Sequence, residues 1–237
     1  MTSPHWPLAG LLLRTPQVEL RWPAPADLAA LATLAADGVH DPAVQPFSVP
    51  WTDAPPADRA RGTLQYHWRL WGSWQPADWR LALVAVRGGT VTGMQELAAR
   101  DFAALREVST GSWLGRGFQG QGIGTHMRAA VLALAFEGLS AEYATSEAFP
   151  DNLASSGVSR KLGYAEDGCE RLLVRGQPVR ATRYRLDRAS WQAHRAIPVE
   201  ISGLTACLPC FGLVPAGDAV TAGEAKPDGP PDAWADE

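Results

Sequence analysis

Apolar positions recur with two different periods along the chain, and each period predicts one type of element. Residues 25–36 are predicted to form a helix that ends before Gly38, because apolar side chains recur there at helical spacing. The apolar face of this helix carries Leu28, Leu31, Leu34 and Ala35. A second helix is expected over residues 57–74, after a loop at 40–56 that contains five prolines.

Strands are predicted where β-branched and apolar residues cluster between turn signals. Residues 10–23 are typical of a strand that enters the fold, and two β-rich runs within 79–99 are joined by Gly88-Gly89, which favours a hairpin. The rest of the pattern predicts a strand at 105–115, a helix at 125–138, a strand at 141–149, a short helix at 152–164 and a last hairpin over 170–186. This order, β-α-α-β-β-β-α-β-α-β-β, indicates an α+β fold with an antiparallel meander in its middle.

Three segments are distinguished by composition. Residues 1–195 are predicted to be the folded domain, and residues 196–214 are an apolar extension that could add a strand, pack on the domain or contact a partner. Residues 215–237 contain six acids and a single lysine, so this tail carries −5, is expected to be disordered, and leaves the preceding 214 residues at +1. A net charge of −4 argues against binding to nucleic acid.

The overall composition indicates where the protein is located and whether it binds a metal. There is no run of about 18 apolar residues and no basic leader, so we expect a cytoplasmic protein without a membrane segment. Cys207 and Cys210 form a C-x-x-C pair, but a zinc site would need a second pair of ligands and only His194 is near. We therefore predict no metal site.

Residues 115–125, "GRGFQGQGIGT", form a glycine-rich loop between a predicted strand and a predicted helix. Residues 115–120 match G-x-G-x-x-G, the dinucleotide fingerprint, but no repeated βαβ units surround them. Residues 119–124 match Q-x-x-G-x-G, in which backbone N–H groups and a helix N-terminus can bind a pyrophosphate. The second interpretation favours coenzyme A as the ligand, and a plain glycine-rich turn is the structural alternative.

Three stretches resemble the GNAT superfamily of acyl-CoA-dependent N-acyltransferases, and in particular its ribosomal-protein N-terminal acetyltransferases. They are "LRTPQVELRW", "GSWLGRGFQGQGIGT" and "DNLASSGVSRKLGYAEDG", and the resemblance covers roughly residues 10–190. It implies a mostly antiparallel sheet flanked by helices and splayed between the strands at 107–114 and 142–148. It also implies direct transfer of an acyl group to a primary amine from acetyl-CoA or, as the alternative donor, succinyl-CoA.

The resemblance assigns cofactor contacts residue by residue. Trp113 and Leu114 would contact the pantetheine arm through their backbone, and Arg116 would be a charge partner. The pyrophosphate would lie against Gln119, Gly120, Gly122, Gly124 and Thr125. Asn152 would bond the pantetheine or the thiol end, and it is also well placed to cap the helix that follows it.

The catalytic residues follow from the same resemblance. Many members place a tyrosine where this chain has Ser159, whereas the ribosomal-protein branch uses a serine at the position of Ser155. We therefore predict Ser155 as the proton donor to the thiolate, with a plain helix-face serine as the alternative. Glu147 is the preferred base over Glu96 and Glu107. Residues 172–175, where that branch carries its acid, contain none, which puts ribosomal substrates in doubt.

The acceptor side is predicted from the aromatic residues of the N-terminal half. Trp51, His67 and Trp71 are the candidate substrate-binding residues, for an amine on a protein N-terminus, a lysine or a small molecule. The apolar extension at 196–214 is a candidate homodimer contact. A different class of function, an acyl-CoA-binding regulatory module without turnover, stays open because the tyrosine is missing and the base is uncertain.

Overall fold

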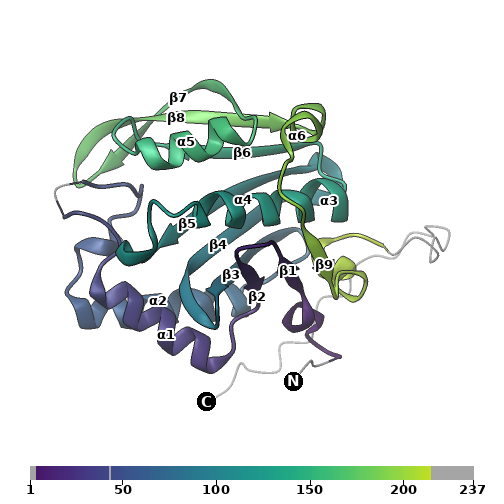
Figure 1. Ribbon diagram of the computed structural model, residues 1–237, viewed down its shortest axis with the longest axis horizontal. Helices are drawn as coiled ribbons and strands as arrows, with labels where there is room; N and C mark the ends of the chain where they lie inside the picture. The colour runs from purple at the N-terminus through teal and green to yellow at the C-terminus, as the bar shows by residue number, and fades with distance from the viewer. Residues whose placement is uncertain (1–3, 43, 215–237) are drawn as a thin grey trace, which may run out of the picture.

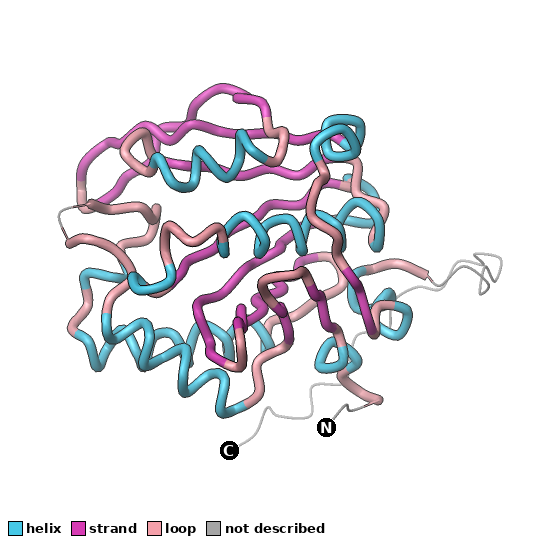
Figure 2. The backbone as a smooth tube through the Cα atoms, viewed as in Figure 1, coloured by secondary structure: helices cyan, strands magenta, loops and turns pink. Residues whose placement is uncertain are grey.

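The computed structural model describes residues 4–42 and 44–214, and the acidic tail that we expected to be disordered lies outside them. Within these residues the chain forms one nine-stranded sheet with helices packed on both faces, drawn as magenta strands and cyan helices in Figure 2. The order of the strands in the sheet is β7-β8-β6-β5-β4-β3-β2-β1-β9. Their bounds are β1 (Leu12–Arg14), β2 (Glu19–Arg21), β3 (Asp78–Arg87), β4 (Thr90–Arg100), β5 (Glu107–Leu114), β6 (Tyr143–Ala148), β7 (Ala165–Val174), β8 (Gln177–Asp187) and β9 (Glu200–Ser202).

The helices agree with most of the sequence prediction. They are α1 (Pro25–Asp37), α2 (Pro56–Gly72), α3 (Phe102–Leu105), α4 (Ile123–Ala133), α5 (Leu153–Lys161) and α6 (Arg188–His194). Short helical turns are η1 (Pro7–Gly10), η2 (Trp51–Asp53), η3 (Arg116–Phe118) and η5 (Thr205–Phe211), and α4 continues as the π-helix η4 (Leu134–Gly138). The predicted α+β class is therefore confirmed, while α3 and α6 were not anticipated.

Strand β3 shows why the sheet is covered on both faces. Leu81, Leu83 and Ala85 belong to the core under α4, whereas Ala82 and Val84 belong to a second core under α1 and α2. Successive side chains of a strand point to opposite faces, so a continuous apolar run requires cover on both sides. Figure 1 shows α1 and α2 beside β3 and β4, and α4 and α5 along the strands from β5 to β8.

Strands β5 and β6 separate after a short contact, as predicted for residues 107–114 and 142–148. They form the parallel pair among the described strands, and only from Glu107↔Tyr143 to Ser109↔Thr145. Beyond Ser109, β5 stays paired with β4 up to Leu114, and β6 stays paired with β8. The splayed region opens a gap in the middle of the sheet.

The entering strand expected at 10–23 is instead a tight hairpin of β1 and β2. Pro16 has no N–H to give to a neighbouring strand, and the Thr15 side chain accepts a bond of 3.1 Å from the N–H of Val18. The backbone N–H of Thr15 also donates to the Val18 carbonyl at 2.9 Å. These bonds reverse the chain within four residues.

The apolar extension joins the sheet at its edge. Strand β9 pairs with β1 in antiparallel register through Leu13↔Ile201. Phe211 is fully buried, and its ring centroid lies 4.9 Å from that of Trp79. The segment therefore adds a strand and packs on the domain, while homodimerisation stays a prediction.

Helix length also bears on membrane insertion. Over the described residues, every helix is too short or too polar to cross a bilayer.

Candidate functional site

An open cleft of about 1810 Å³ occupies the splayed region of the sheet. It is lined by β5 and β6, by the starts of α4 and α5, by α2, and by the loop before α2. It brings together the following predicted site residues: Trp51, His67, Trp113, Leu114, Gln119, Gly120, Gly122, Gly124, Thr125, Glu147, Asn152 and Ser155. Two predicted residues lie outside this lining. Trp71 stacks on Trp22 with ring centroids 5.0 Å apart, and Arg116 is exposed on η3.

The glycine-rich loop presents backbone at the start of α4. Gly120 and Gly122 have φ of 72° and 80°, in the left-handed region that favours glycine. Gly122 is the N-cap of α4, and no atom lies within 4 Å of the position that a Cβ on Gly120 would take. The first N–H groups of a helix lack partners within the helix and carry a partial positive charge. This end of the cleft can therefore bind an anionic group such as a pyrophosphate.

Gln119 fastens this loop through its side chain. Its Nε2 donates to the carbonyls of Val39, at 2.6 Å, and Leu114, at 2.9 Å. The amide thus ties the loop to the end of α1 and to β5. A contact of Gln119 with an anion would have to come from its backbone.

The outer edge of β5 faces the cleft at the residues expected to contact pantetheine. Beyond Ser109 the strand has a partner only on its β4 side, so alternate backbone groups near Trp113 and Leu114 are left open to the cleft. A Cβ on Gly93 of β4 would overlap the Trp113 carbonyl, so the pairing here requires glycine.

Helix α5 starts at the opposite wall of the cleft. Asn152 is its N-cap, as predicted, and its Oδ1 accepts a bond of 3.1 Å from the N–H of Ser155. The Asn152 amide NH₂ keeps its donors for other partners. Ser155 is half-buried and belongs to the lining of the cleft.

The three glutamates named from the sequence differ in their surroundings. Glu147 lies on β6 beyond the splay and is exposed as a residue; partial desolvation of its carboxyl group in the cleft, and then the neighbouring Glu170, raise its pKa. Glu107 pairs with Arg185 at 2.6 Å at the other end of the strand contact. Glu170 lies on β7 and lines the cleft, so β7 does present a carboxylate there, two residues before the stretch 172–175.

Glu96 is the third, and it forms a polar cluster that the sequence did not reveal. It is 7% exposed on β4, and its Oε1 accepts a bond of 2.8 Å from Arg80 while its Oε2 accepts a bond from the Tyr66 hydroxyl. Burial, and then the Glu96 charge, raise the pKa of Tyr66. The sequence showed only a glutamate within an otherwise apolar strand. The cluster could not be predicted from it, because its partners come from α2 and β3.

Aromatic side chains line the cleft beside this cluster. The ring of Trp51 lies 5.6 Å from that of Trp113 and 5.4 Å from that of Phe47. His67 is fully buried; its Nδ1 contacts the Thr63 carbonyl at 3.0 Å, and its Nε2 has no partner among the described residues. Burial lowers the pKa of His67, so the imidazole is neutral near pH 7.

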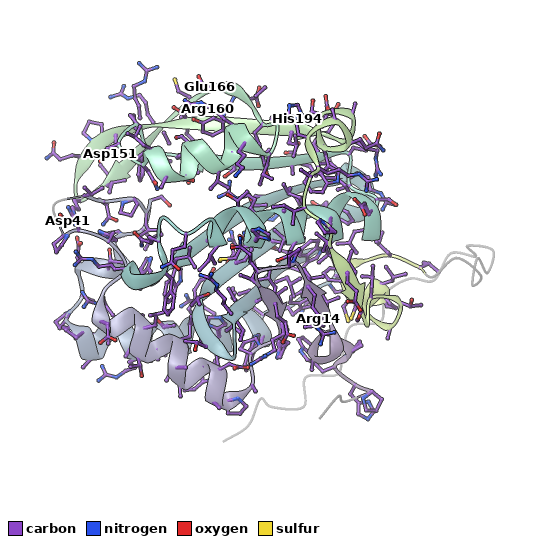
Figure 3. All side chains as sticks on the ribbon, in the orientation of Figure 1. Arg14, Asp41, Asp151, Arg160, Glu166 and His194 are labelled. Atoms are coloured by element: carbon purple, nitrogen blue, oxygen red, sulfur yellow. The ribbon has the colours of Figure 1, made fainter. Side chains whose placement is uncertain are left out.

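A bidentate ion pair joins two elements beside the cleft, η2 and the β7–β8 hairpin, although neither of its residues belongs to the lining. Nε and NH2 of Arg175, at the tip of the β7–β8 hairpin, donate to the Asp53 carboxylate of η2 at 2.8 and 2.5 Å. Figure 1 shows η2's loop and this hairpin approaching each other at the left. Asp41 and Asp151, which do line the cleft, lie on that side in Figure 3.

Comparisons with known proteins agree with this architecture. The family model described as "Acetyltransferase (GNAT) domain" matches residues 17–165. Among solved structures, Mycobacterium smegmatis RimJ in complex with CoA-disulfide is 22% identical, with a TM-score of 0.65, over 77% of this chain and 90% of that chain. The ribosomal L7/L12 alpha-N-protein acetyltransferase RimL is 19% identical, with a TM-score of 0.58, over 74% and 93%.

A third similar structure is the microcin C7 self-immunity acetyltransferase MccE in complex with acetyl-CoA and AMP. It is 16% identical, with a TM-score of 0.57, over 73% of this chain and 93% of that chain. At these identities, the three structures show a shared fold.

Proposed function

Because this chain belongs to the family of GNAT acetyltransferase domains, we propose that it acetylates a primary amine that enters the cleft beside Glu96 and Trp51. Membership in the family makes the protein an acyl-CoA-dependent acetyltransferase that acts on an amine. The observation that supports this acceptor position is the cleft itself. It joins the anion-binding start of α4 to the aromatic and acidic cluster across the splayed strands.

Acetyl-CoA fits the residues at the α4 end of the cleft. When bound, it supplies an activated acyl group as a thioester. The N–H groups around Gly120, Gly122 and Gly124 would hold the pyrophosphate, where a side chain at position 122 would bring strain. The open edge of β5 at Trp113 and the Asn152 amide would bond the pantetheine arm.

Two residues are assigned to proton transfer. The acceptor amine must lose a proton to attack, and a carboxylate with a raised pKa is a better base near neutral pH than an ordinary one. Glu147 has that property and lines the cleft beyond the splay. Ser155 on the facing wall would donate a proton to the departing sulfur.

The acceptor is proposed to be a slender amine, either the N-terminus of a polypeptide or a small molecule. Trp51, Phe47 and Met94 form an apolar wall, and Glu96 provides a carboxylate near it. An ammonium group is attracted to a carboxylate and to aromatic faces. A succinyl donor remains an alternative to the acetyl donor within the same mechanism.

The test is release of free thiol from acetyl-CoA in the presence of three amine classes. These are peptides with a free N-terminus, N-terminally blocked peptides that contain lysine, and small amines. Glu147→Gln is expected to lower kcat by about 100-fold and to remove the acid limb of the pH profile, as loss of a general base does. Glu166→Gln is the matched control, because Glu166 pairs with Arg160 on the surface, outside the cleft.

Two results would contradict the proposal. Tight binding of acetyl-CoA without release of free thiol in the presence of any of these amines would indicate a binding module without turnover. Acetylation of blocked lysine peptides in preference to the other two classes would overturn the assigned acceptor.

A further inference from the structure

Arg128 of α4 is a buried cation without an anionic partner. The residue is 4% exposed, and its NH1 donates to the hydroxyls of Ser146 and Ser159, both at 3.0 Å. Its Nε is buried without a hydrogen-bond partner among the described residues. No ion pair within that part of the chain includes it.

The charge of Arg128 is not neutralised by its neighbours. Burial lowers its pKa, but a guanidinium stays protonated in proteins. The titratable group that faces it is Tyr164, whose pKa is raised by its own burial, so the phenol is neutral. The serines of β6 and α5 supply dipoles without charge. A buried charge without a counter-charge is costly, so the site is suited to an anion from outside the chain.

The position of Arg128 indicates which anion this is. The residue lines the cleft, and Ser146 comes directly after the last pair of β5 with β6. It lies six residues after Gly122 on the same helix, which is roughly 9 Å along the axis. Ser159 lies one helical turn after Ser155. Arg128 therefore lies on the helix that begins at the anion-binding loop, and its partner Ser159 lies on the same helix as the serine assigned to the sulfur.

We propose that Arg128 is the counter-charge for the thiolate that leaves during acetyl transfer. This inference rests on the proposed function. The amine nitrogen forms a bond to the thioester carbon, the carbon–sulfur bond breaks, and its electron pair stays on sulfur. The amine proton goes to Glu147, so the sulfur leaves as an anion beside the guanidinium; it then takes a proton from Ser155, which regains one from solvent. Arg128 thus stabilises the negative charge on the leaving sulfur, because the Ser155 hydroxyl is a weak acid.

The experiment measures the pKa of the CoA thiol in the complex, by the ultraviolet absorbance of the thiolate as pH is raised. The complex with desulfo-CoA is the blank, which removes the signal of the protein's cysteines. A free thiol has a pKa of about 8.5, and a nearby opposite charge is expected to lower it by about 1–3 units. Arg128→Gln and Arg128→Met should return the value to that of free CoA or above.

Arg188→Gln is the matched control. Arg188 also donates to neutral groups, the carbonyls of Phe136 and Ala141, at 2.7 and 2.5 Å, but it lies outside the cleft lining. This variant should keep the lowered thiol pKa. In steady-state assays, Arg128→Gln should lower kcat by at least about 10-fold, the equivalent of about one pKa unit.

The outcomes separate this inference from the proposed function. An unshifted thiol pKa in the wild-type complex overturns the inference by itself, even where the variants do not fold. If Arg128→Gln weakens only succinyl-CoA binding and leaves the thiol pKa unchanged, the anion is an acyl carboxylate and the thiolate assignment is wrong. If neither CoA nor desulfo-CoA binds, the proposed function fails first.

Discussion

The two ends of the cleft are built in different ways. Most of the proposed cofactor end comes from one continuous stretch, the last residues of β5, the loop with Gly120 and Gly122, and the start of α4, to which the start of α5 adds Asn152 and Ser155. The acceptor end combines side chains from the loop before α2, from α2 itself, and from β3 and β4. The hydrogen bond between Tyr66 and Glu96, for example, joins residues 30 positions apart.

The comparison shows why one end of the cleft can be predicted from the sequence and the other cannot. At the cofactor end, the proposed ligand contacts come from backbone N–H groups whose geometry is set by left-handed glycines and a helix start. At the acceptor end, the proposed contacts come from side chains whose neighbours are fixed only by tertiary packing. We therefore expect substitutions at each end to affect one substrate and not the other.

Gly122→Glu should give the largest effect, on the cofactor end alone. A side chain at φ of 80° is strained, and its carboxylate would compete with the pyrophosphate at the helix start. We expect CoA binding, measured by calorimetry, to weaken by at least about 100-fold, the equivalent of some 2.7 kcal/mol.

Gly117→Glu is the control for that substitution. Gly117 belongs to the same loop, but its φ is not in the left-handed region and a Cβ there would meet no atom within 4 Å. Its CoA affinity should stay within about 3-fold of wild type, a small electrostatic effect at an exposed site. Equal losses of CoA affinity in both variants would mean that the added charge, and not the backbone geometry at Gly122, determines binding.

Glu96→Gln should give an intermediate effect, on the acceptor end alone. The change removes a buried charge that bonds Tyr66 and Arg80. A hydrogen bond to a charged group contributes about 1.5–3 kcal/mol, so kcat/KM for the amine should fall by roughly 10- to 100-fold. Asp78→Asn, which removes a surface ion pair with Arg100, should leave it unchanged. A parallel loss of CoA affinity in Glu96→Gln would break the separation of the two ends.

His67→Gln should give the smallest effect, on the pH dependence of stability. The pKa of His67 is lowered in the folded state, so below about pH 6.5 the unfolded chain binds a proton that the folded chain does not. Stability should therefore be complete above pH 6.5 and fall as pH decreases, by at most about 1.4 kcal/mol per pH unit for one group. Urea unfolding of both proteins at several pH values measures this slope. A variant with the same acid slope as the wild type would exclude His67 as its cause.

Much of the fold was predictable because its signals are local. Gly38 ends α1 and Asn152 caps α5 where the sequence placed them, since both depend on residues within one helical turn. The splay between β5 and β6 followed from the family resemblance and is confirmed by their short pairing. The hairpin at β1 and β2 was missed because the role of Pro16 and the Thr15 side chain in reversing the chain was not recognised.

The parts that could not be predicted depend on distant partners. The pairing of β9 with β1 joins residues nearly 190 positions apart, and a three-residue strand carries almost no periodicity. Arg128 has the sequence context of an apolar helix face, and its neighbours on β6 and α5 appear only in three dimensions. The candidate residues from sequence that line the cleft are therefore mostly those of the loop, whereas Arg116 lies outside the lining and few residues were named across the cleft.

The ion pair between Asp53 and Arg175 has a topological consequence. The hairpin tip, β8, β6, β5, β4, β3, α2 and η2 are each in contact with the next, and this ion pair joins the last to the first. Elements that line the cleft therefore form a closed ring of contacts, which the Asp53–Arg175 pair completes. We expect entry to be lengthwise, which suits a free chain end or a small amine, whereas a lysine on the surface of a folded protein would be stopped by its own domain at the rim.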